Sequence, residues 1–373
     1  MSKGTAHSEN GRMQPPIRLD SIQNNKQGHR TFKNQGLGCK MGKLSTEDLK
    51  KLLGCIKRDA RVIVPPHPGF DSGVHLIDDK CIVVSTDPCV GVPENWFGWL
   101  LIHYAASDVA LFGAKPEYCA INLLGPAKTK PETFYKVMRQ ACKAAEELEM
   151  AIVTGHTGVY DGLSSLVGVC TAYGTVESSK LITPGGARPG DYILFTKSLG
   201  LEIAVNFALI RRELAEKLFG ARRVMELSRL VSMQSCVKEA LLLADVGGIH
   251  AMHDATEGGL TSALHEMADN SGVGFKVERE KIPVSKEVQT LAGFFKLSEE
   301  QILSMSSTGT VLAAVSPKAK DKVARVLRQN NVEASFLGVF LKDERRILVK
   351  NGKETLFPQK ANDPYERILF GKL

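Results

Sequence analysis

The segment LITPGGARPGD, residues 181–191, divides the chain into two halves that each alternate apolar strands with helices. Its two prolines and three glycines break any regular element. Before it, the apolar periodicity predicts strands at GVHLIDD, CIVVSTD, AINLLG, AIVTG and SLVGVCTAYGTV, and helices at LSTEDLKKLLGCIK, WFGWLLIHYAASDVALFG and PETFYKVMRQACKAAEELE. After it, the same reasoning predicts strands at YILFTK, IHAM, FKVERE, TVLAAV, ASFLGVF and RRILVK, and helices at residues 201–218, VSMQSCVKEALLLA, LTSALHEMADNSG, LSEEQILS and KAKDKVARVLRQN. The sequence therefore predicts an α+β fold with two parts of similar size.

Length and composition agree with two domains. A chain of 373 residues with 43% apolar residues can bury a sizeable core. Residues 1–40 are rich in Gly, Asn, Gln, Lys and Ser, so we expect a disordered tail there. The expected organisation is this tail, an N-terminal domain at 42–176, a linker at 177–190, a C-terminal domain at 191–350 and a C-terminal tail at 351–373.

Several classes of protein are disfavoured. No apolar window is long enough to span a membrane and the chain starts without an apolar signal region, so we expect a soluble cytoplasmic protein. The net charge is +7, but outside a cluster in the N-terminal tail the remaining basic residues are mixed with acids, which disfavours a nucleic-acid partner. That cluster consists of Lys26, His29, Arg30, Lys33 and Lys40. The eight cysteines form no CxxC pair, which favours reduced core residues over a metal site or disulfides.

Four aspartates lie where predicted elements end or turn. They are Asp71 in PGFDSGV, Asp87 in CIVVSTDP, Asp108 in YAASDVALFGAKP and Asp254 in HAMHDATEGGL. Taken singly, each could simply cap a turn. Together they offer the several oxygen ligands that a hard divalent ion needs when it bridges phosphates. The pattern favours a magnesium-dependent, phosphate-handling enzyme.

Two glycine-containing segments are candidate phosphate contacts. In VTGHTGV, Gly155 and Thr157 flank His156 directly after a predicted strand, and a turn there would let backbone N–H groups approach an anion. His156 could contact phosphate, act as an acid or base, or only fill the turn.

The second candidate segment is the start of a predicted helix in HDATEGGL. Thr256, Gly258 and Gly259 follow Asp254 there, and a helix N-terminus offers unpaired N–H groups to an anion. The turn SSTG before TVLAAV could be a further phosphate cradle or a plain loop. The chain contains no GxxxxGK[ST] loop, no strand-linked GxGxxG, no GxSxG and no HExxH.

In order along the chain, GKLSTEDLKKLL, PGFDSGVHLID, VVSTDP, HYAASDVALFGAKP, AIVTGHTGV, GARPGDYILFTKSLG, MHDATEGGLTSALHEMA and SSTGTVLAAV resemble the PurM-type, AIR synthase-related ATP-binding superfamily. The similarity covers about residues 42–350 and is greatest to the HypE-like branch. It implies an N-terminal α+β domain that pairs with a second copy into a dimeric β-barrel, followed by a C-terminal α+β domain that closes over the nucleotide.

The resemblance also implies cofactors and roles. Members use ATP and Mg2+ to activate a small acceptor by phosphorylation. Asp71, Asp87, Asp108 and Asp254 would bind metal and phosphate, with Asp87 and Asp108 also catalytic. The implied nucleotide contacts, beside Asp71 and Asp254, are Gly155, Thr157, Thr256, Gly258 and Gly259, and His156 is a catalytic candidate.

Three departures from the family pattern bear on this reading. Phe70 precedes Asp71 where the family often has a second acid, and His156 stands where HypE and thiamine-phosphate kinases usually have Asp. The chain ends in RILFGKL rather than in a segment with a terminal Cys, so we do not expect chemistry on its own C-terminus. GLGCK at 36–40 resembles the selenophosphate synthetase loop, with Leu37 in place of the nucleophilic Cys.

We therefore expect a homodimeric enzyme that uses ATP and Mg2+ to activate a small oxygen-containing or amide substrate. The alternatives are an ATP-binding maturation or assembly partner without turnover, and a phosphotransferase similar to selenophosphate synthetase or thiamine-phosphate kinase. The sequence does not identify the acceptor.

Overall fold

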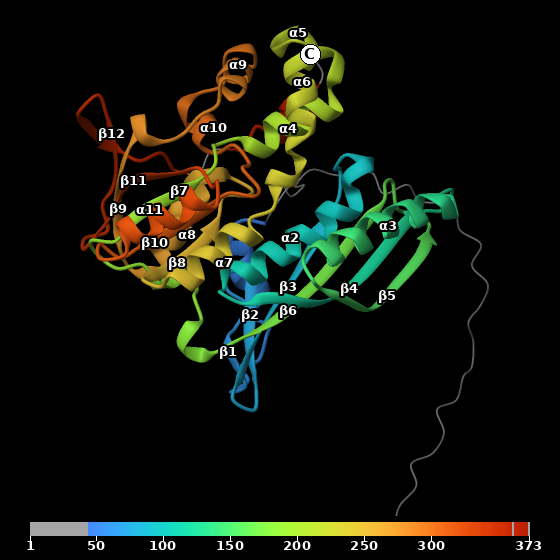
Figure 1. Ribbon diagram of the computed structural model, residues 1–373, viewed down its shortest axis with the longest axis horizontal. Helices are drawn as coiled ribbons and strands as arrows, with labels where there is room; N and C mark the ends of the chain where they lie inside the picture. The colour runs from blue at the N-terminus through green and yellow to red at the C-terminus, as the bar shows by residue number, and fades with distance from the viewer. Residues whose placement is uncertain (1–43, 360–361, 372–373) are drawn as a thin grey trace, which may run out of the picture. The chain divides into compact units, whose positions relative to one another are not determined.

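The computed structural model describes residues 44–359 and 362–371, which fall in one compact unit (Figure 1). The tail expected at 1–40 and the GLGCK segment lie outside the described residues. Among the helices of the described chain, none is long and apolar enough to cross a membrane.

The N-terminal part contains a six-stranded sheet with the order β1-β2-β3-β6-β4-β5. Its strands are β1 (Val62–Val64), β2 (Ser72–Ile77), β3 (Lys80–Cys89), β4 (Lys115–Pro126), β5 (Ala151–Tyr160) and β6 (Val167–Val176). Its helices are α1 (Thr46–Leu53), α2 (Phe97–Leu111) and α3 (Pro131–Glu147). All pairs are antiparallel except β4 with β5, which α3 connects as a crossover.

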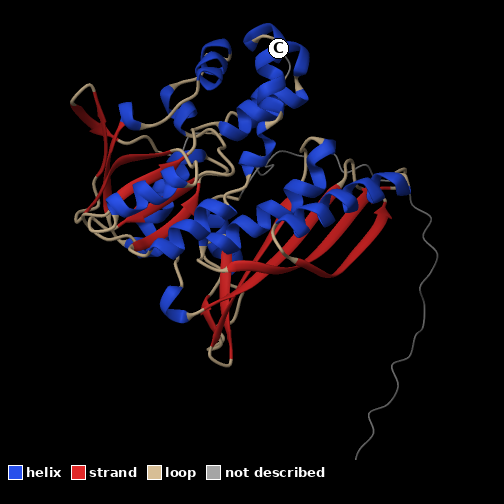
Figure 2. Cartoon of the chain, in the orientation of Figure 1, coloured by secondary structure: helices blue, strands red, loops and turns tan. Residues whose placement is uncertain are grey.

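Helices α2 and α3 cover one face of this sheet (Figure 2). Nearly all of α2 is buried, as its largely apolar sequence predicts. Gly98 allows the two helices to approach closely, because a Cβ there would lie 2.1 Å from the carbonyl oxygen of Val137. The other face of the sheet carries half-buried and exposed residues, including the stacked rings of Tyr118 and Tyr173.

The C-terminal part contains a seven-stranded sheet with the order β13-β12-β9-β11-β7-β10-β8. Its strands are β7 (Tyr192–Thr196), β8 (Ile249–Asp254), β9 (Gly274–Glu278), β10 (Val311–Val315), β11 (Ala334–Leu341), β12 (Arg346–Lys350) and β13 (Lys353–Leu356). Its helices are α4 (Leu201–Ile210), α5 (Arg212–Phe219), α6 (Ala221–Ser228), α7 (Val237–Val246), α8 (Gly259–Ser271), α9 (Lys286–Phe294), α10 (Glu299–Leu303), α11 (Lys320–Gln329) and α12 (Tyr365–Leu369), and a short 3-10 helix, η4 (Leu230–Gln234), precedes α7.

Alternate residues of β10 pack into two different cores. Val311, Ala313 and Val315 join the cluster that contains α7 and α11, whereas Leu312 and Ala314 join the cluster that contains α8. Both faces of this strand are therefore covered, which explains its continuous apolar sequence. The predicted α+β fold with two sheets is confirmed.

The structure corrects several predicted elements. Pro88 does not end β3, because the strand continues to Cys89 and Pro88 pairs with Val169. The helix predicted at 201–218 breaks at Arg211 into α4 and α5, and VSMQSCVKEALLLA is split between η4 and α7. Elements that the sequence analysis did not predict are β1, β13, α6, α9 and α12. All seven described cysteines are free, and five of them are buried, as expected.

Candidate functional site

The four aspartates come from four different elements. Asp71 directly precedes β2, Asp87 lies in β3, Asp108 lies near the end of α2, and Asp254 is the last residue of β8. Asp87 shares its face of the sheet with Ser85, the face that α2 covers. The fold thus directs carboxylates from both halves of the chain toward the end of α2.

Asp108 shows that these carboxylates converge. Burial raises its pKa well above the ordinary value, and the negative charges of Asp87, Asp71 and Asp254 raise it further. The hydroxyl of Ser85 donates a hydrogen bond of 2.7 Å to Asp108, which opposes the rise and fixes the orientation of the carboxyl group. The four residues therefore act on one another electrostatically, as a shared cation site requires.

His253 is a site residue that sequence reasoning missed. Its Nδ1 atom lies 3.4 Å from Asp254 and 3.7 Å from Asp71, and its Nε2 atom lies 3.0 Å from Glu266. Burial lowers the pKa of this imidazole, but the contacts with Asp254 and Glu266 and the charge of Asp71 raise it well above its ordinary value overall. The imidazolium partly compensates the carboxylates around it. The only sequence signal was its position beside Asp254.

The donor set fits a divalent ion. One ligand atom each from Asp71, His253 and Asp254 can be chosen so that all lie within 4.8 Å of one another. His253 would be a ligand only as the neutral imidazole, so the two carboxylates are the main donors. Beside Asp71, the buried hydroxyl of Ser72 has no hydrogen-bond partner within the described chain. Carboxylate oxygens are the ligands that magnesium prefers, and a hydroxyl can hold a bound water. Phe70, which replaces an acid in the family pattern, packs edge-on against Phe112 instead.

At the start of α8, where the sequence predicts an anion contact, a carboxylate of the chain itself accepts hydrogen bonds. The Asp363 carboxylate accepts hydrogen bonds from the Gly258 N–H (3.2 Å) and from the Ser306 hydroxyl (2.5 Å). Gly259 is required at this position, because a Cβ would lie 2.3 Å from the carbonyl oxygen of Met305. Thr256 lies beside the aspartates, with its hydroxyl donating to Asp254 over 3.5 Å. Sequence reasoning missed Asp363, which lies in a segment expected to be a tail.

A buried acid lies beside the predicted SSTG turn. The Thr308 hydroxyl donates a 2.5 Å hydrogen bond to Glu202 in α4. Burial raises the pKa of Glu202 to about 7. The Thr308 hydrogen bond lowers this pKa, whereas the charges of Asp363 and Glu257 raise it. This turn is therefore tied to α4 and, through Ser306, to the C-terminal segment.

The turn expected at Gly155, His156 and Thr157 is wrong, because these residues lie in the middle of β5. Asp87 pairs with Cys170, Cys170 with Ile121 and Ile121 with Gly155, so three strand spacings, about 14 Å, separate β3 from β5. His156 follows Gly155 and faces the other side of the sheet, where its Nε2 atom lies 2.5 Å from the Tyr160 hydroxyl. Within one copy of the chain it cannot reach the aspartates.

Glycine at 155 has another explanation. A Cβ there would lie 2.3 Å from the carbonyl oxygen of Ile121, so the close approach of β5 to β4 excludes larger residues. The glycine that suggested a phosphate turn is therefore explained by strand packing.

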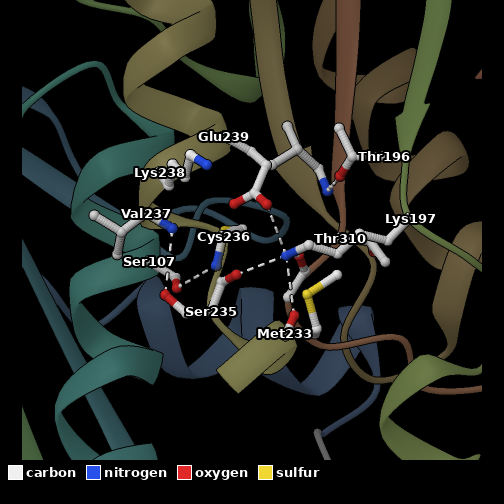
Figure 3. Close-up of polar contacts among 12 residues, drawn as sticks. Ser107, Thr196, Lys197, Met233, Ser235, Cys236, Val237, Lys238, Glu239 and Thr310 are labelled. Carbon is white, nitrogen blue, oxygen red and sulfur yellow. Dashed lines mark hydrogen bonds and ion pairs between the residues drawn. The ribbon is translucent and has the colours of Figure 1, made fainter. Parts of the chain in front are cut away.

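A buried lysine, Lys197, contacts the segment that leads into α7 (Figure 3). Lys197 follows β7 with a positive φ of 57°, and its ammonium group donates to the carbonyl oxygens of Met233 (3.0 Å), Ser235 (2.7 Å) and Gly309 (2.5 Å). It also lies 3.1 Å from the Glu239 carboxylate, with both side chains buried. The SSTG turn is thus tied to the segment before α7.

Comparison with known proteins matches two consecutive domains of one family. Residues 69–176 match the N-terminal domain, and residues 188–351 the C-terminal domain, of AIR synthase related proteins. A putative hydrogenase expression/formation protein of Methanocaldococcus jannaschii is 27% identical over 80% of this chain and 88% of its own length. The carbamoyl dehydratase HypE of Cupriavidus necator is 28% identical over 69% of this chain and 71% of its own length.

A solved structure shares the fold. The hydrogenase maturation protein HypE in complex with ATP superimposes with a TM-score of 0.64 over 85% of this chain and 91% of that chain, at 21% identity. At this identity the similarity concerns the fold alone.

Proposed function

Because the chain belongs to the AIR synthase related family, in its HypE-like branch, we propose that it is an ATP- and magnesium-dependent enzyme. It activates a small oxygen-containing or amide acceptor by phosphorylation. The observation that carries this proposal is the grouping of Asp71, His253 and Asp254, whose ligand atoms lie within 4.8 Å of one another, with Asp108 held by Ser85 near the charges of Asp71, Asp87 and Asp254. The name of one relative, a carbamoyl dehydratase, points the same way.

Different residues of the chain are suited to bind the cation and the phosphate. Asp71, Asp87 and Asp254 would hold magnesium, which supplies charge neutralisation of the phosphate oxygens when it is bound. Ser85 keeps Asp108 oriented toward the same position. The Gly258 N–H and the Ser306 hydroxyl, which bind a carboxylate here, are suited to hold a phosphate oxygen.

The test is ATP turnover by the full chain. We expect ADP formation that requires magnesium and stops with a chelator, and saturable calorimetric binding of a non-hydrolysable ATP analogue with magnesium. Failure to bind the analogue would overturn the proposal. Tight binding without ADP formation, even with carbamoyl and other amide acceptors added, would instead favour an assembly partner.

The homodimer is part of the same proposal. β5 is an edge strand of its sheet and is exposed over most of its length, with Val153 50% and Tyr160 45% exposed. Next to it, Tyr118 is 42% exposed on the sheet face that α2 and α3 leave open. An uncovered apolar sheet face and edge are suited to pairing with a second copy. Such a copy would also bring another His156, which the aspartates cannot reach within one chain.

We expect Tyr118→Asp to shift the purified protein from dimer to monomer in light scattering, because a buried, unpaired carboxylate would oppose the interface. Tyr135→Asp is the matched control, since Tyr135 is 61% exposed on the outer surface of α3. A wild-type protein that is monomeric at all concentrations would contradict the proposal, as would a dimer that Tyr118→Asp leaves intact.

A further inference from the structure

A pocket of about 360 Å³ lies apart from the aspartates, between the first half of α2, the end of α3 and the segment that leads into α7. Trp99, Leu148, Val237 and Val332 supply apolar surface, and His103 lines the same pocket. Its volume falls at the lower end of the range for small-molecule sites. Nothing in the proposed ATP chemistry uses it.

His103 is the residue that indicates a ligand. It is 4% exposed, and its ring stacks on Trp99 with 3.7 Å between ring centroids. Burial lowers the pKa of this histidine to about 3, so the imidazole is neutral. Its Nδ1 atom lies 2.8 Å from the Ser235 hydroxyl, whereas its Nε2 atom has no hydrogen-bond partner among the described residues. A buried polar atom without a partner is costly unless a ligand or water satisfies it.

The neighbouring polar groups indicate which hydrogen-bonding groups such a ligand must carry. Glu147 accepts a hydrogen bond from the Trp99 indole (2.9 Å), and its Oε2 atom lies 3.9 Å from the His103 Nε2 atom. If Nδ1 carries the proton and donates to Ser235, the Nε2 lone pair and the Glu147 carboxylate are two acceptors whose atoms lie 3.9 Å apart. A group with several N–H donors satisfies both.

The charges of the pocket favour a cation. Its lining includes three carboxylates, from Glu147, Glu239 and Glu333, and two ammonium groups. Lys197 donates to three carbonyl oxygens and pairs with Glu239, and Lys238 donates to the carbonyl oxygen of Asn330. Glu147 and Glu333 are the lining carboxylates that neither of these lysines compensates. Acceptors therefore outnumber available donors among the lining groups.

We propose that this pocket binds a small organic ammonium ion. Its N–H groups donate to Glu147 and to the His103 Nε2 atom, and its carbon chain packs against the apolar lining. This assignment does not depend on the proposed enzymatic function.

Hydrogen bonds connect the pocket wall to Lys197 and to Ser107, and Figure 3 shows these contacts of Ser235 and Cys236. The Ser235 hydroxyl contacts His103, while the Ser235 carbonyl accepts from Lys197, which in turn holds Gly309 of the SSTG turn. The next residue, Cys236, donates its N–H to the hydroxyl of Ser107 over 3.2 Å, immediately before Asp108.

The test is calorimetric titration of the full chain with butylammonium chloride, with 1-butanol as the neutral probe of similar size. We expect saturable binding of butylammonium and none of butanol. Glu147→Gln should weaken binding by at least about tenfold, the loss typical of a charge-assisted hydrogen bond, while it can still accept from Trp99. His103→Phe should weaken it as well.

Glu146→Gln is the matched control, because this neighbouring carboxylate does not line the pocket. It should bind butylammonium as the wild type does. Thermal unfolding verifies that each variant is folded. If His103→Phe does not fold, Glu147→Gln alone tests the proposal. No saturable binding of butylammonium, equal binding of butanol, or unchanged binding by Glu147→Gln would overturn the proposal.

Discussion

Asp254→Asn is expected to lower magnesium-dependent ATP turnover by at least about a hundredfold, more than is typical when only a group behind a metal ligand is changed. Asp254 is 4% exposed at the end of β8, and its carboxylate faces His253 and the other aspartates. Asparagine keeps the size of the side chain but removes one negative charge from the cation site. Initial rates of ADP release, measured over a range of magnesium concentrations, should show the loss and a higher magnesium requirement.

Asp245→Asn is the control for this change, because Asp245 is an exposed carboxylate near the end of α7. It should leave both the rate and the magnesium requirement unchanged. Equal activity of Asp254→Asn and wild type would remove Asp254 from the cation site and with it the main support for the proposed chemistry.

Lys197→Met is expected to destabilise the fold by about 3–5 kcal/mol, the cost of leaving one partner of a buried ion pair without the other. Methionine fills a similar volume, but the Glu239 carboxylate and three carbonyl oxygens lose their common donor. Urea unfolding followed by circular dichroism should show a lower midpoint at an unchanged slope.

The double variant Lys197→Met, Glu239→Gln tests this explanation. It should recover part of the lost stability, because it removes the uncompensated charge while the carbonyl oxygens still lack a donor. Lys238→Met, at an exposed neighbouring position, should have little effect. If Lys197→Met proves as stable as Lys238→Met, the buried contacts of Lys197 do not stabilise the fold.

The sequence predicted the elements whose pattern is local. Examples are the apolar stretch of α2 and the apolar patterns of the strands β2, β3, β6 and β10. A helix or strand that buries a face needs apolar residues at the spacing of that face, and this spacing can be seen in the sequence. The four aspartates could also be selected, since each lies at an element end or near a glycine turn.

The remaining site residues depend on contacts between distant segments. Glu266 and Asp71 surround His253, Asp363 reaches α8 from more than a hundred residues away, and Lys197 meets carbonyl groups from two other segments. No local sequence pattern predicts contacts between segments that are so far apart in the chain. The error at Gly155 has the same origin, because a glycine required by a neighbouring strand looks like a glycine required by a turn.

The Asp363 carboxylate at the start of α8 has a consequence for affinity measurements. It already uses the Gly258 N–H and the Ser306 hydroxyl, so a phosphate oxygen that binds these donors must displace it. A measured dissociation constant then reports an exchange between two anions. The apparent association constant equals the intrinsic constant multiplied by the fraction of molecules in which Asp363 does not bond to these donors. Asp363→Asn, which carries no charge to compete, should therefore bind nucleotide more tightly than the wild type.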